Sequence, residues 1–327
     1  ITQSFAYVDK TGLLAPLVSQ GGRYFLSRPR RFGKSLTCST LDAIFCGRKE
    51  LFDGLAISKT DYTWPVRPVV RFDFEQIDHD TPERLEQSLH NTINNMASKA
   101  GLVLSTQLLK EKFAELIVKL AEQGGPVAVI IDEYDKAILD HLANKTKADA
   151  MRELLRNFYG TLKSKDVDSN LHFVFITGVS KFSKVALFSE LNNLSDLTMH
   201  PRAATLCGYT QSELEVVFDE HINGFAQKQN TTKQHMLDEL KRWYNGYDFA
   251  LTGQTVYNPF SILNCFDQLQ FFNYWFASGT PNFLIQALAH NSRAAEELIQ
   301  INTWQIAASD LDAFSADEGD DGHCRER

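Results

Sequence analysis

The chain has 327 residues, enough for two domains or for one domain with a substantial appendage. Hydrophobic residues make up 43% and charged residues 23%, which excludes a mostly disordered or collagen-like chain. The formal net charge of -8 argues against a surface that coats nucleic acid in general. Apolar runs are far shorter than the roughly 20 residues of a membrane helix, so we expect no membrane partner.

The ends of the chain and the cysteines also bear on its class. No positively charged segment followed by an apolar run opens the chain, so we expect no secretory signal and a cytoplasmic protein. The five scattered cysteines form no C-x-x-C pair and are expected to be reduced thiols. Ser309 to Arg327 holds seven acidic and two basic residues, so we expect residues 302–327 to be a disordered or truncated acidic tail.

Strand-like and helix-like segments alternate over residues 1–209. Continuous apolar runs such as Val127–Asp132 are typical of strands buried on both faces of a parallel sheet, whereas Val69–Phe74 alternates and is rich in β-branched and aromatic residues. The expected strands are Tyr24–Ser27, Val69–Phe74, Val127–Asp132 and Phe173–Gly178, with Leu194–Met199 as a candidate fifth. Helical patterns lie between them, two over Pro82–Ala121 around Gly101 and one over Met151–Lys163. The sequence therefore predicts an α/β fold with a mainly parallel central sheet flanked by helices.

The pattern changes near Thr210. SELEVVFDEHINGFA and KQHMLDELKRWY have helical periodicity, and a turn-rich aromatic segment, NGYDFALTGQTVYNPF, follows them. Further helical segments continue to about Ile301. We expect residues 210–301 to form a smaller helical domain, a lid or junction that leans on the first.

RPRRFGKS, Arg28 to Ser35, lies between an expected strand and an expected helix. Gly33, Lys34 and Ser35 supply the last three elements of the phosphate-loop pattern G-x-x-x-x-G-K-[ST], in which Lys reaches phosphate oxygens and the hydroxyl holds Mg²⁺. Arg28 replaces the first Gly of that pattern. Five basic residues without an acid favour an anion site, for nucleotide or for nucleic-acid phosphates: Arg23, Arg28, Arg30, Arg31 and Lys34.

Two acidic residues follow the apolar run VAVII, about 100 residues after Lys34. Asp132 is placed to help hold Mg²⁺ opposite the Ser35 hydroxyl, and Glu133 to polarise an attacking water. Asp135 and Lys136 are expected to form a solvated helix start. Thr177, which ends the next strand, is a candidate to contact the γ-phosphate or position water, and a structural role for it is equally compatible with the sequence.

At this point the chain resembles the AAA-ATPase-like proteins of bacteria. The resemblance rests on blocks that span most of the chain to about residue 290: YVDKT, YFLSRPRRFGKSL, IIDEYDK, LRNFYGTLKS, FVFITGVSKFSKV, ATLCGYT, WYNGYDF, VYNPFSIL and NYWFASGTPNFLI. It implies a P-loop NTPase of the additional-strand catalytic-glutamate type, in which the loss of the first Gly at Arg28 is a family trait. It also implies that a C-terminal nuclease-like domain of the PD-(D/E)XK type, absent here, follows in relatives and could engage nucleic acid.

The resulting functional hypothesis is a Mg²⁺-dependent ATP-binding and ATP-hydrolysing switch or motor. Its catalytic residues are expected to be Glu133, Lys34 and Thr177, and its metal residues Ser35 and Asp132. The expected nucleotide-binding residues are Arg30, Arg31, Phe32, Gly33, Lys34, Ser35, Leu36 and, where relatives carry a nucleotide-sensing proline, Pro259. Tyr244, Tyr247, Tyr257 and Trp275 are expected in the core or at the domain junction.

Four alternatives and extensions remain open on the sequence. A nucleotide-gated binding module with negligible turnover would use the same residues. A phosphotransferase would use Glu133 to deprotonate a substrate hydroxyl, and a nucleic-acid-binding protein would use the Arg28–Arg31 cluster. Arg156 is a candidate to reach the γ-phosphate of a neighbouring subunit in a homo-oligomer.

Overall fold

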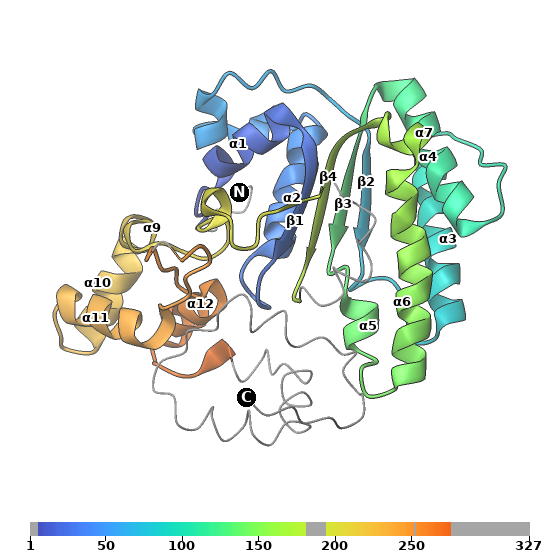
Figure 1. Ribbon diagram of the computed structural model, residues 1–327. Helices are drawn as coiled ribbons and strands as arrows, with labels where there is room; N and C mark the ends of the chain where they lie inside the picture. The colour runs from blue at the N-terminus through green and yellow to red at the C-terminus, as the bar shows by residue number, and fades with distance from the viewer. Residues whose placement is uncertain (1–5, 181–193, 252, 276–327) are drawn as a thin grey trace, which may run out of the picture.

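A computed structural model describes residues 6–180, 194–251 and 253–275. Its centre is a five-stranded sheet in the order β2-β3-β4-β1-β5, and all of its pairings are parallel (Figure 1). The strands are β1 (Gly22–Ser27), β2 (Val69–Asp73), β3 (Val127–Asp132), β4 (Leu171–Gly178) and β5 (Ser195–Asp196). The α/β class and the parallel sheet predicted from the sequence are confirmed.

The strand order separates the two strands that carry the chemical motifs. β4 lies between β1, which leads into the RPRRFGKS loop, and β3, which ends in Asp132. This is the additional strand that the family resemblance implies. Because all strands are parallel, their carboxyl ends meet at one edge of the sheet.

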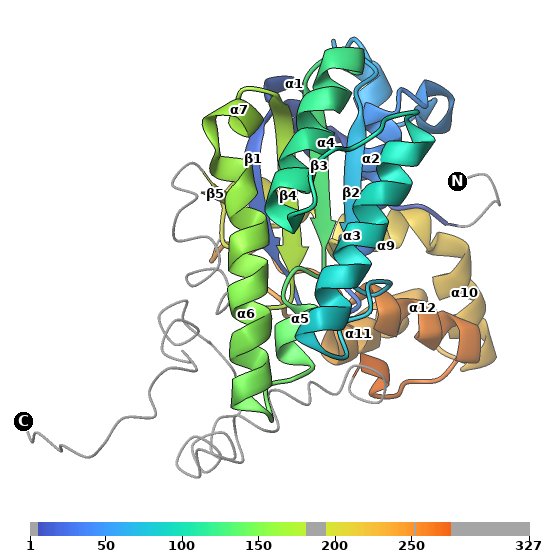
Figure 2. The ribbon, with the colours of Figure 1, turned by 90° about the vertical axis from the view of Figure 1, so that its right-hand side faces the viewer.

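Helices cover both faces of the sheet (Figures 1 and 2). One face carries α1 (Thr11–Gln20) and α2 (Lys34–Phe45), with the 3-10 turns η1 (Lys49–Phe52) and η2 (Ala56–Lys59). The other carries α3 (Pro82–Lys99), α4 (Leu109–Gly124), α6 (Lys145–Gly160), η3 (Thr161–Lys163) and α7 (Lys165–Asp168). The short α5 (Lys136–Leu139) follows β3 at the carboxyl edge.

Alternation along the buried strands divides the apolar side chains between two cores. In β3, Val129 and Ile131 pack with the α3, α4 and α6 layer, whereas Ala128 and Ile130 pack with α1 and α2. Side chains two residues apart share a face of a strand. Asp132 therefore points to the side of the sheet where α2 begins.

A separate group of helices follows the sheet. It contains α9 (Gln211–Val217), α10 (Asp219–Lys228), α11 (Lys233–Tyr244) and α12 (Pro259–Gln268), which we call the helical cluster, preceded by η4 (Pro201–Ala203). Thr210 begins α9 with a reciprocal capping box, and Thr232 and Asn258 cap α11 and α12. The cluster has its own apolar core, and it lies beside the carboxyl end of β1 (Figure 1).

Two details of the expected elements change. The helix expected over 212–226 is interrupted, because α9 ends at Val217 and α10 begins at Asp219. The helix expected from Met151 begins earlier, since the Asn144 side chain accepts a hydrogen bond from the Lys147 N–H and caps α6.

The segments expected beyond Trp275, including residues 302–327, lie outside the described residues. Among the described helices, none is long and apolar enough to cross a membrane.

Candidate functional site

The RPRRFGKS loop joins β1 to α2 at the carboxyl edge of the sheet. β1 ends at Ser27 and α2 begins at Lys34. Gly33 caps α2 with a left-handed φ of 98°, which disfavours any residue with a Cβ. The first N–H groups of a helix have no partner within that helix and point toward its N-terminus. The loop thus has the glycine turn and the helix N-terminus of an anion cradle.

Lys34 crosses from the loop to the end of β3. Its side chain is only 3% exposed, and its Nζ lies 3.2 Å from Glu133 Oε1. The same ammonium lies 3.4 Å from the Pro29 carbonyl oxygen, so the side chain folds over its own loop. This contact brings together two of the residues that the sequence assigned to catalysis.

Asp132 carries a buried carboxylate at the end of β3. It is 1% exposed, and neither Oδ1 nor Oδ2 accepts a hydrogen bond from a described residue. Burial raises the pKa of Asp132, and the nearby Ser35 hydroxyl opposes that shift. The two residues expected at the metal are therefore neighbours, the buried Asp132 from β3 and the exposed Ser35 from α2.

Thr177 lies beside Asp132 on the neighbouring strand. β3 and β4 pair with Ile131 opposite Ile176, so the next residues along each strand are adjacent and share a face. Thr177 is fully buried, and its hydroxyl has no partner among the described residues. At the edge near Ser35, both carboxylate oxygens of Asp132 and the Thr177 hydroxyl are thus buried without a close hydrogen-bond partner in the part of the chain that the structure describes.

Glu133 has an unusual backbone. Its φ is 54°, in the left-handed region that costs a non-glycine residue on the order of 1 kcal/mol or more. The side chain is 13% exposed, so the carboxylate lies near the surface of the site and not in the core. The turn directs Glu133 toward Lys34, whereas the preceding Asp132 remains buried.

Asp135 corrects a sequence expectation. We expected a solvated helix start, but Asp135 is fully buried and accepts hydrogen bonds from the N–H groups of Val179 and Ser180 and from the Ser180 hydroxyl. Burial raises its pKa to about 6, and Glu133 adds to the shift. The residue fills the space between the end of β3 and the end of β4. Lys136 is also not free, since its Nζ lies 3.1 Å from Asp140 and 3.4 Å from Glu75.

The five basic residues expected to form one anion site are divided by the fold. Arg28 is 1% exposed, and its guanidinium donates to the carbonyls of Ser27, Thr198 and Ala203. Arg23 lies at the opposite end of β1, where it pairs with Asp168 at 2.7 Å. The Arg28–Arg31 cluster is therefore not a continuous exposed basic surface, because its first member is inside the protein.

The remaining residues of the expected nucleotide site differ in the solvent exposure and the contacts of their side chains. Arg31 is exposed and lies over the Phe260 ring at 5.0 Å, whereas Arg30 lies 4.0 Å from Asp140. The Phe32 side chain is buried, so only its backbone can face a ligand, and Leu36 is 57% exposed in the first turn of α2. Pro259 is the first residue of α12, next to Phe260. Its nucleotide-sensing role stays a prediction.

The tyrosines and the tryptophan of the junction are where the sequence placed them. Tyr244 and Tyr257 are buried in the core of the helical cluster. Tyr247 packs against the Phe32 ring, and Trp275 donates from Nε1 to the Arg30 carbonyl oxygen at 3.0 Å. Arg156 is half-exposed on α6 and pairs with Glu153, and a role toward a neighbouring subunit stays a prediction.

Asp73 is a site neighbour that the sequence reasoning missed. It ends β2 and pairs in register with Asp132, whose pKa its charge helps to raise. Its own carboxylate accepts from the Glu75 N–H and the Gln76 side chain. The sequence pattern that could have predicted this neighbour is that Val69–Phe74 and Val127–Asp132 both place an Asp at or next to the end of an expected strand.

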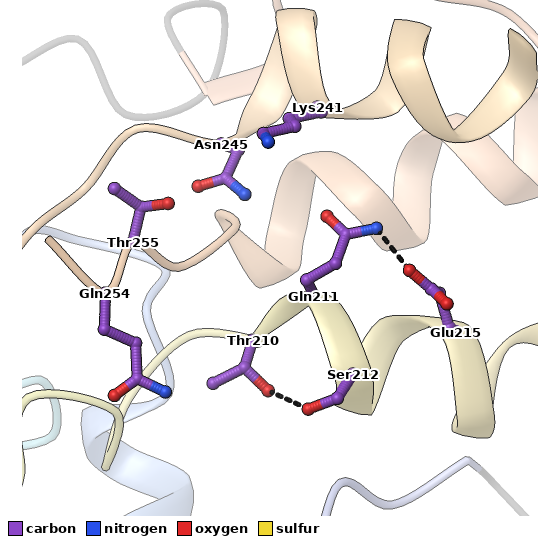
Figure 3. A pocket seen from close by; sticks show the side chains of 8 residues that line it. All are labelled: Thr210, Gln211, Ser212, Glu215, Lys241, Asn245, Gln254 and Thr255. Carbon is purple, nitrogen blue, oxygen red and sulfur yellow. Dashed lines mark hydrogen bonds between the residues drawn. The ribbon is translucent and has the colours of Figure 1, made fainter. Parts of the chain in front are cut away.

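Two cavities lie outside these motifs. One of about 400 Å³ opens between α9, α11 and the segment before α12 (Figure 3). Its lining is polar and consists of Thr210, Gln211, Ser212, Glu215, Lys241, Asn245, Gln254 and Thr255. A second, of about 510 Å³, lies around His79, Asp140 and His141. Neither lining includes a residue of the loop from Arg28 to Ser35 or of β3.

The chain belongs to the family described as "Predicted AAA-ATPase", whose profile matches residues 1–188. With the loop and the parallel sheet, this membership defines a P-loop nucleotide-binding module. A curated relative from Azotobacter chroococcum mcd 1, described as "Uncharacterized protein in vnfD 5'region", is 40% identical over 299 residues. The match covers 91% of this chain and 55% of that protein, so the chain spans about half the length of its relative.

Two solved structures resemble part of the chain. They are the Aeropyrum pernix ORC1 protein in complex with DNA and the Aeropyrum pernix ORC2 protein in ADPNP-ADP complexes. Each is 12% identical, and each match covers 71% of this chain. The matches cover 58% and 59% of those chains, with TM-scores of 0.35 and 0.34.

Proposed function

We propose that this chain is a Mg²⁺-dependent switch that binds and hydrolyses ATP. The observation that carries the proposal is the Asp132 carboxylate, which is buried, has no hydrogen-bond partner among the described residues and lies near the Ser35 hydroxyl. An unpaired buried carboxylate costs several kcal/mol, so a cation at this point would relieve a cost already built into the fold. Carboxylate and hydroxyl oxygens suit Mg²⁺, a hard cation that is shared with substrate phosphates.

The other residues take roles that their positions support. Lys34 and the N–H groups of Gly33 and Ser35 would bind phosphate oxygens, and Thr177 would contact the γ-phosphate or position water. Bound Mg²⁺ would supply charge neutralisation on the phosphates. ATP is proposed over other nucleotides because the chain belongs to the AAA-ATPase family.

The Lys34–Glu133 ion pair suggests how binding and hydrolysis are linked. The two charges lie 3.2 Å apart, so each neutralises the other. Phosphate oxygens would compete for the Lys34 ammonium, and that competition would release the Glu133 carboxylate. A free carboxylate beside the phosphates can accept a proton from attacking water. The base would thus become available when nucleotide is bound.

The wider context is also a proposal. The curated relative is nearly twice as long as the matched region, which leaves room for an effector region outside this chain. From the family resemblance we propose a nuclease-like effector that engages nucleic acid, controlled by closure of the helical cluster over nucleotide. Assembly into a homo-oligomer and a cytoplasmic location belong to the same proposal.

The first test is equilibrium binding of Mg·ATP to the chain and to Lys34→Ala. Loss of a charged hydrogen-bond donor should weaken binding about 10- to 100-fold. Lys119→Ala is a matched control, because Lys119 also pairs with a glutamate, Glu115, but on the distant α4. Equal affinity of Lys34→Ala and the unmodified chain would refute the phosphate site.

Turnover separates the proposal from a nucleotide-gated module that does not hydrolyse. Glu133→Gln keeps the shape of the side chain but cannot accept a proton, so it should bind Mg·ATP and lose about 100-fold or more in phosphate release. If the unmodified chain holds nucleotide for long periods without releasing phosphate, the non-hydrolysing module is the correct description.

A further inference from the structure

The phosphate loop is held from outside by parts of the chain that follow the sheet. The buried Phe32 ring packs edge-on against Tyr247 at 4.7 Å and against Phe249 at 5.4 Å. The Arg28 guanidinium lies 4.0 Å from the centre of the same Phe249 ring. The aromatic segment that joins α11 to α12 thus contacts the loop at Arg28, where it begins, and at Phe32, just before Gly33.

Two further contacts reach the backbone of the loop. Trp275 Nε1 donates to the Arg30 carbonyl oxygen at 3.0 Å, and the Gly208 N–H donates to the Phe32 carbonyl oxygen at 3.3 Å. Gly208 is adjacent to Tyr209, which bridges to Tyr257 in the helical cluster. Both donors therefore come from segments attached to that cluster.

These contacts determine where the loop N–H groups point. In a trans peptide the carbonyl and the following N–H lie in one plane and point in opposite directions, and the described chain has no cis peptide bond. The carbonyls of Arg30 and Phe32 point toward their donors, Trp275 and Gly208. The N–H groups of the next residues, Arg31 and Gly33, therefore point away from these donors. Arg31 and Gly33 have positive φ values of 70° and 98°. Left-handed residues alternating with ordinary ones are the backbone pattern of anion-binding nests.

We infer that Trp275 is a positioning residue for the phosphate loop, whose indole N–H holds the Arg30–Arg31 peptide in the orientation that binds phosphate. The segments attached to the helical cluster thereby act on nucleotide affinity through the backbone of the loop. This inference rests on the proposed nucleotide site and adds to it a route by which movement of the cluster changes affinity.

The test compares two tryptophan substitutions. Trp275→Phe removes the indole N–H and keeps an aromatic ring, so the peptide loses its outside donor. We expect Mg·ATP to bind about tenfold more weakly, as for the loss of one oriented donor. Trp243→Phe is the matched control, because Trp243 is 43% exposed on α11 and stacks on Phe271. It should leave affinity within about twofold.

A spectroscopic measurement on the unmodified chain tests whether the Trp275 hydrogen bond responds to nucleotide. The Trp275 indole N–H resonance, identified by its loss in Trp275→Phe, should shift when Mg·ADP binds, whereas the Trp243 resonance should not. An indole N–H resonance of Trp275 that stays unchanged on nucleotide binding would contradict the positioning role, because the hydrogen bond to the Arg30 carbonyl would then be insensitive to the state of the loop. If Trp275→Phe fails to fold, the resonances of the unmodified chain can be assigned by sequential NMR and decide the question alone.

The outcomes separate the inference from the proposed function. If Lys34→Ala abolishes binding while Trp275→Phe binds normally and the indole resonance does not move, the inference is wrong and the nucleotide site stands. If the unmodified chain does not bind Mg·ATP, or Lys34→Ala binds equally well, the proposed function fails and the inference fails with it.

Discussion

Gly178, the last residue of β4, lies in the tightest contact between the strand ends. A Cβ placed there would lie 2.5 Å from Asp135 Oδ1 and 2.5 Å from Tyr134 Cδ1. Both neighbours are fully buried and cannot move aside. Gly178→Ala should therefore destabilise the chain by about 1–3 kcal/mol, the usual cost of overpacking a core. Denaturant unfolding monitored by circular dichroism measures this difference.

A matched glycine tests whether the effect is steric. Gly224 lies on the exposed side of α10, and nothing is within 4 Å of the position of its Cβ. Gly224→Ala should be neutral or stabilise by up to about 1 kcal/mol, since alanine is the better helix former. If both variants unfold at the same denaturant concentration as the unmodified chain, the close contacts at Gly178 do not contribute measurably to the free energy of unfolding.

Arg28 shows why the loop tolerates the loss of its first glycine. The side chain points away from the site into a buried position, where it donates to three carbonyls and lies on Phe249. Burial lowers the pKa of the guanidinium to about 10, which still leaves it charged at neutral pH. A residue that leaves the inner surface of the loop in this way takes no space from a phosphate.

At the scale of an element, α5 is joined to the loop after β2 by a histidine. His79 Nε2 lies 3.0 Å from Asp140 Oδ2, and His79 Nδ1 lies 2.7 Å from the Ile77 carbonyl oxygen. Both ring nitrogens face acceptors, so the geometry suits the protonated ring, which donates from both. The bond to Asp140 raises the pKa of His79, against the effect of burial. Burial alone would raise the pKa of Asp140, but the bonds to His79 and Lys136 lower it to about 2.

This pair predicts a specific pH dependence of stability. Because the folded-state pKa of His79 is raised, its contribution is fully present below the unfolded-state pKa and is lost as pH rises through the folded-state value. The unfolding free energy of the unmodified chain minus that of His79→Gln should be larger at about pH 5.5 than at about pH 8.5 by up to about 1 kcal/mol. A difference that is constant over this range, or that grows with pH, would contradict the ion pair.

The helices and strands were predictable where the hydrophobic pattern of a short segment determines its structure. β3 was predicted with its observed bounds, because a strand buried on both faces must be apolar throughout. α11 was also predicted over its observed length, since its buried residues recur at helical spacing. β5 was only a candidate, and it is short, with two residues paired to β1.

At the scale of the whole molecule, the contacts that shape the site were not predictable. The motifs indicated Lys34, Asp132 and Glu133, because each is part of a local pattern of strand, turn and helix. Trp275 contacts Arg30 across 245 residues, and Asp135 contacts Ser180 across the gap between two strands. Nothing in the sequence near either partner encodes such a pairing, because it follows from the packing of the helical cluster and of the strand ends. The burial of Arg28 was missed for the same reason.

The contact between Lys10 and Glu213 is a further pairing of this kind, and it joins the start of the chain to the helical cluster. Lys10 Nζ lies 2.7 Å from Glu213 Oε1 and 2.6 Å from Oε2, 203 residues away in sequence. The side chains are 13% and 26% exposed, so the pair is largely shielded from water. Glu213 also accepts the Thr210 N–H and completes the cap of α9. The pair therefore couples the docking of the cluster to the order of its first helix.

We expect the pair to show a measurable coupling energy. Lys10→Met should destabilise the chain by about 1–2 kcal/mol, because it leaves a partly buried carboxylate without its cation. In a double-mutant cycle with Glu213→Gln, the coupling should be about 1 kcal/mol or more in denaturant unfolding. The exposed pair of Arg242 and Glu239 on α11 is the control and should show little coupling, since water and salt screen it. Additive effects of Lys10→Met and Glu213→Gln would mean that apolar packing, and not this ion pair, holds the helical cluster against the beginning of the chain.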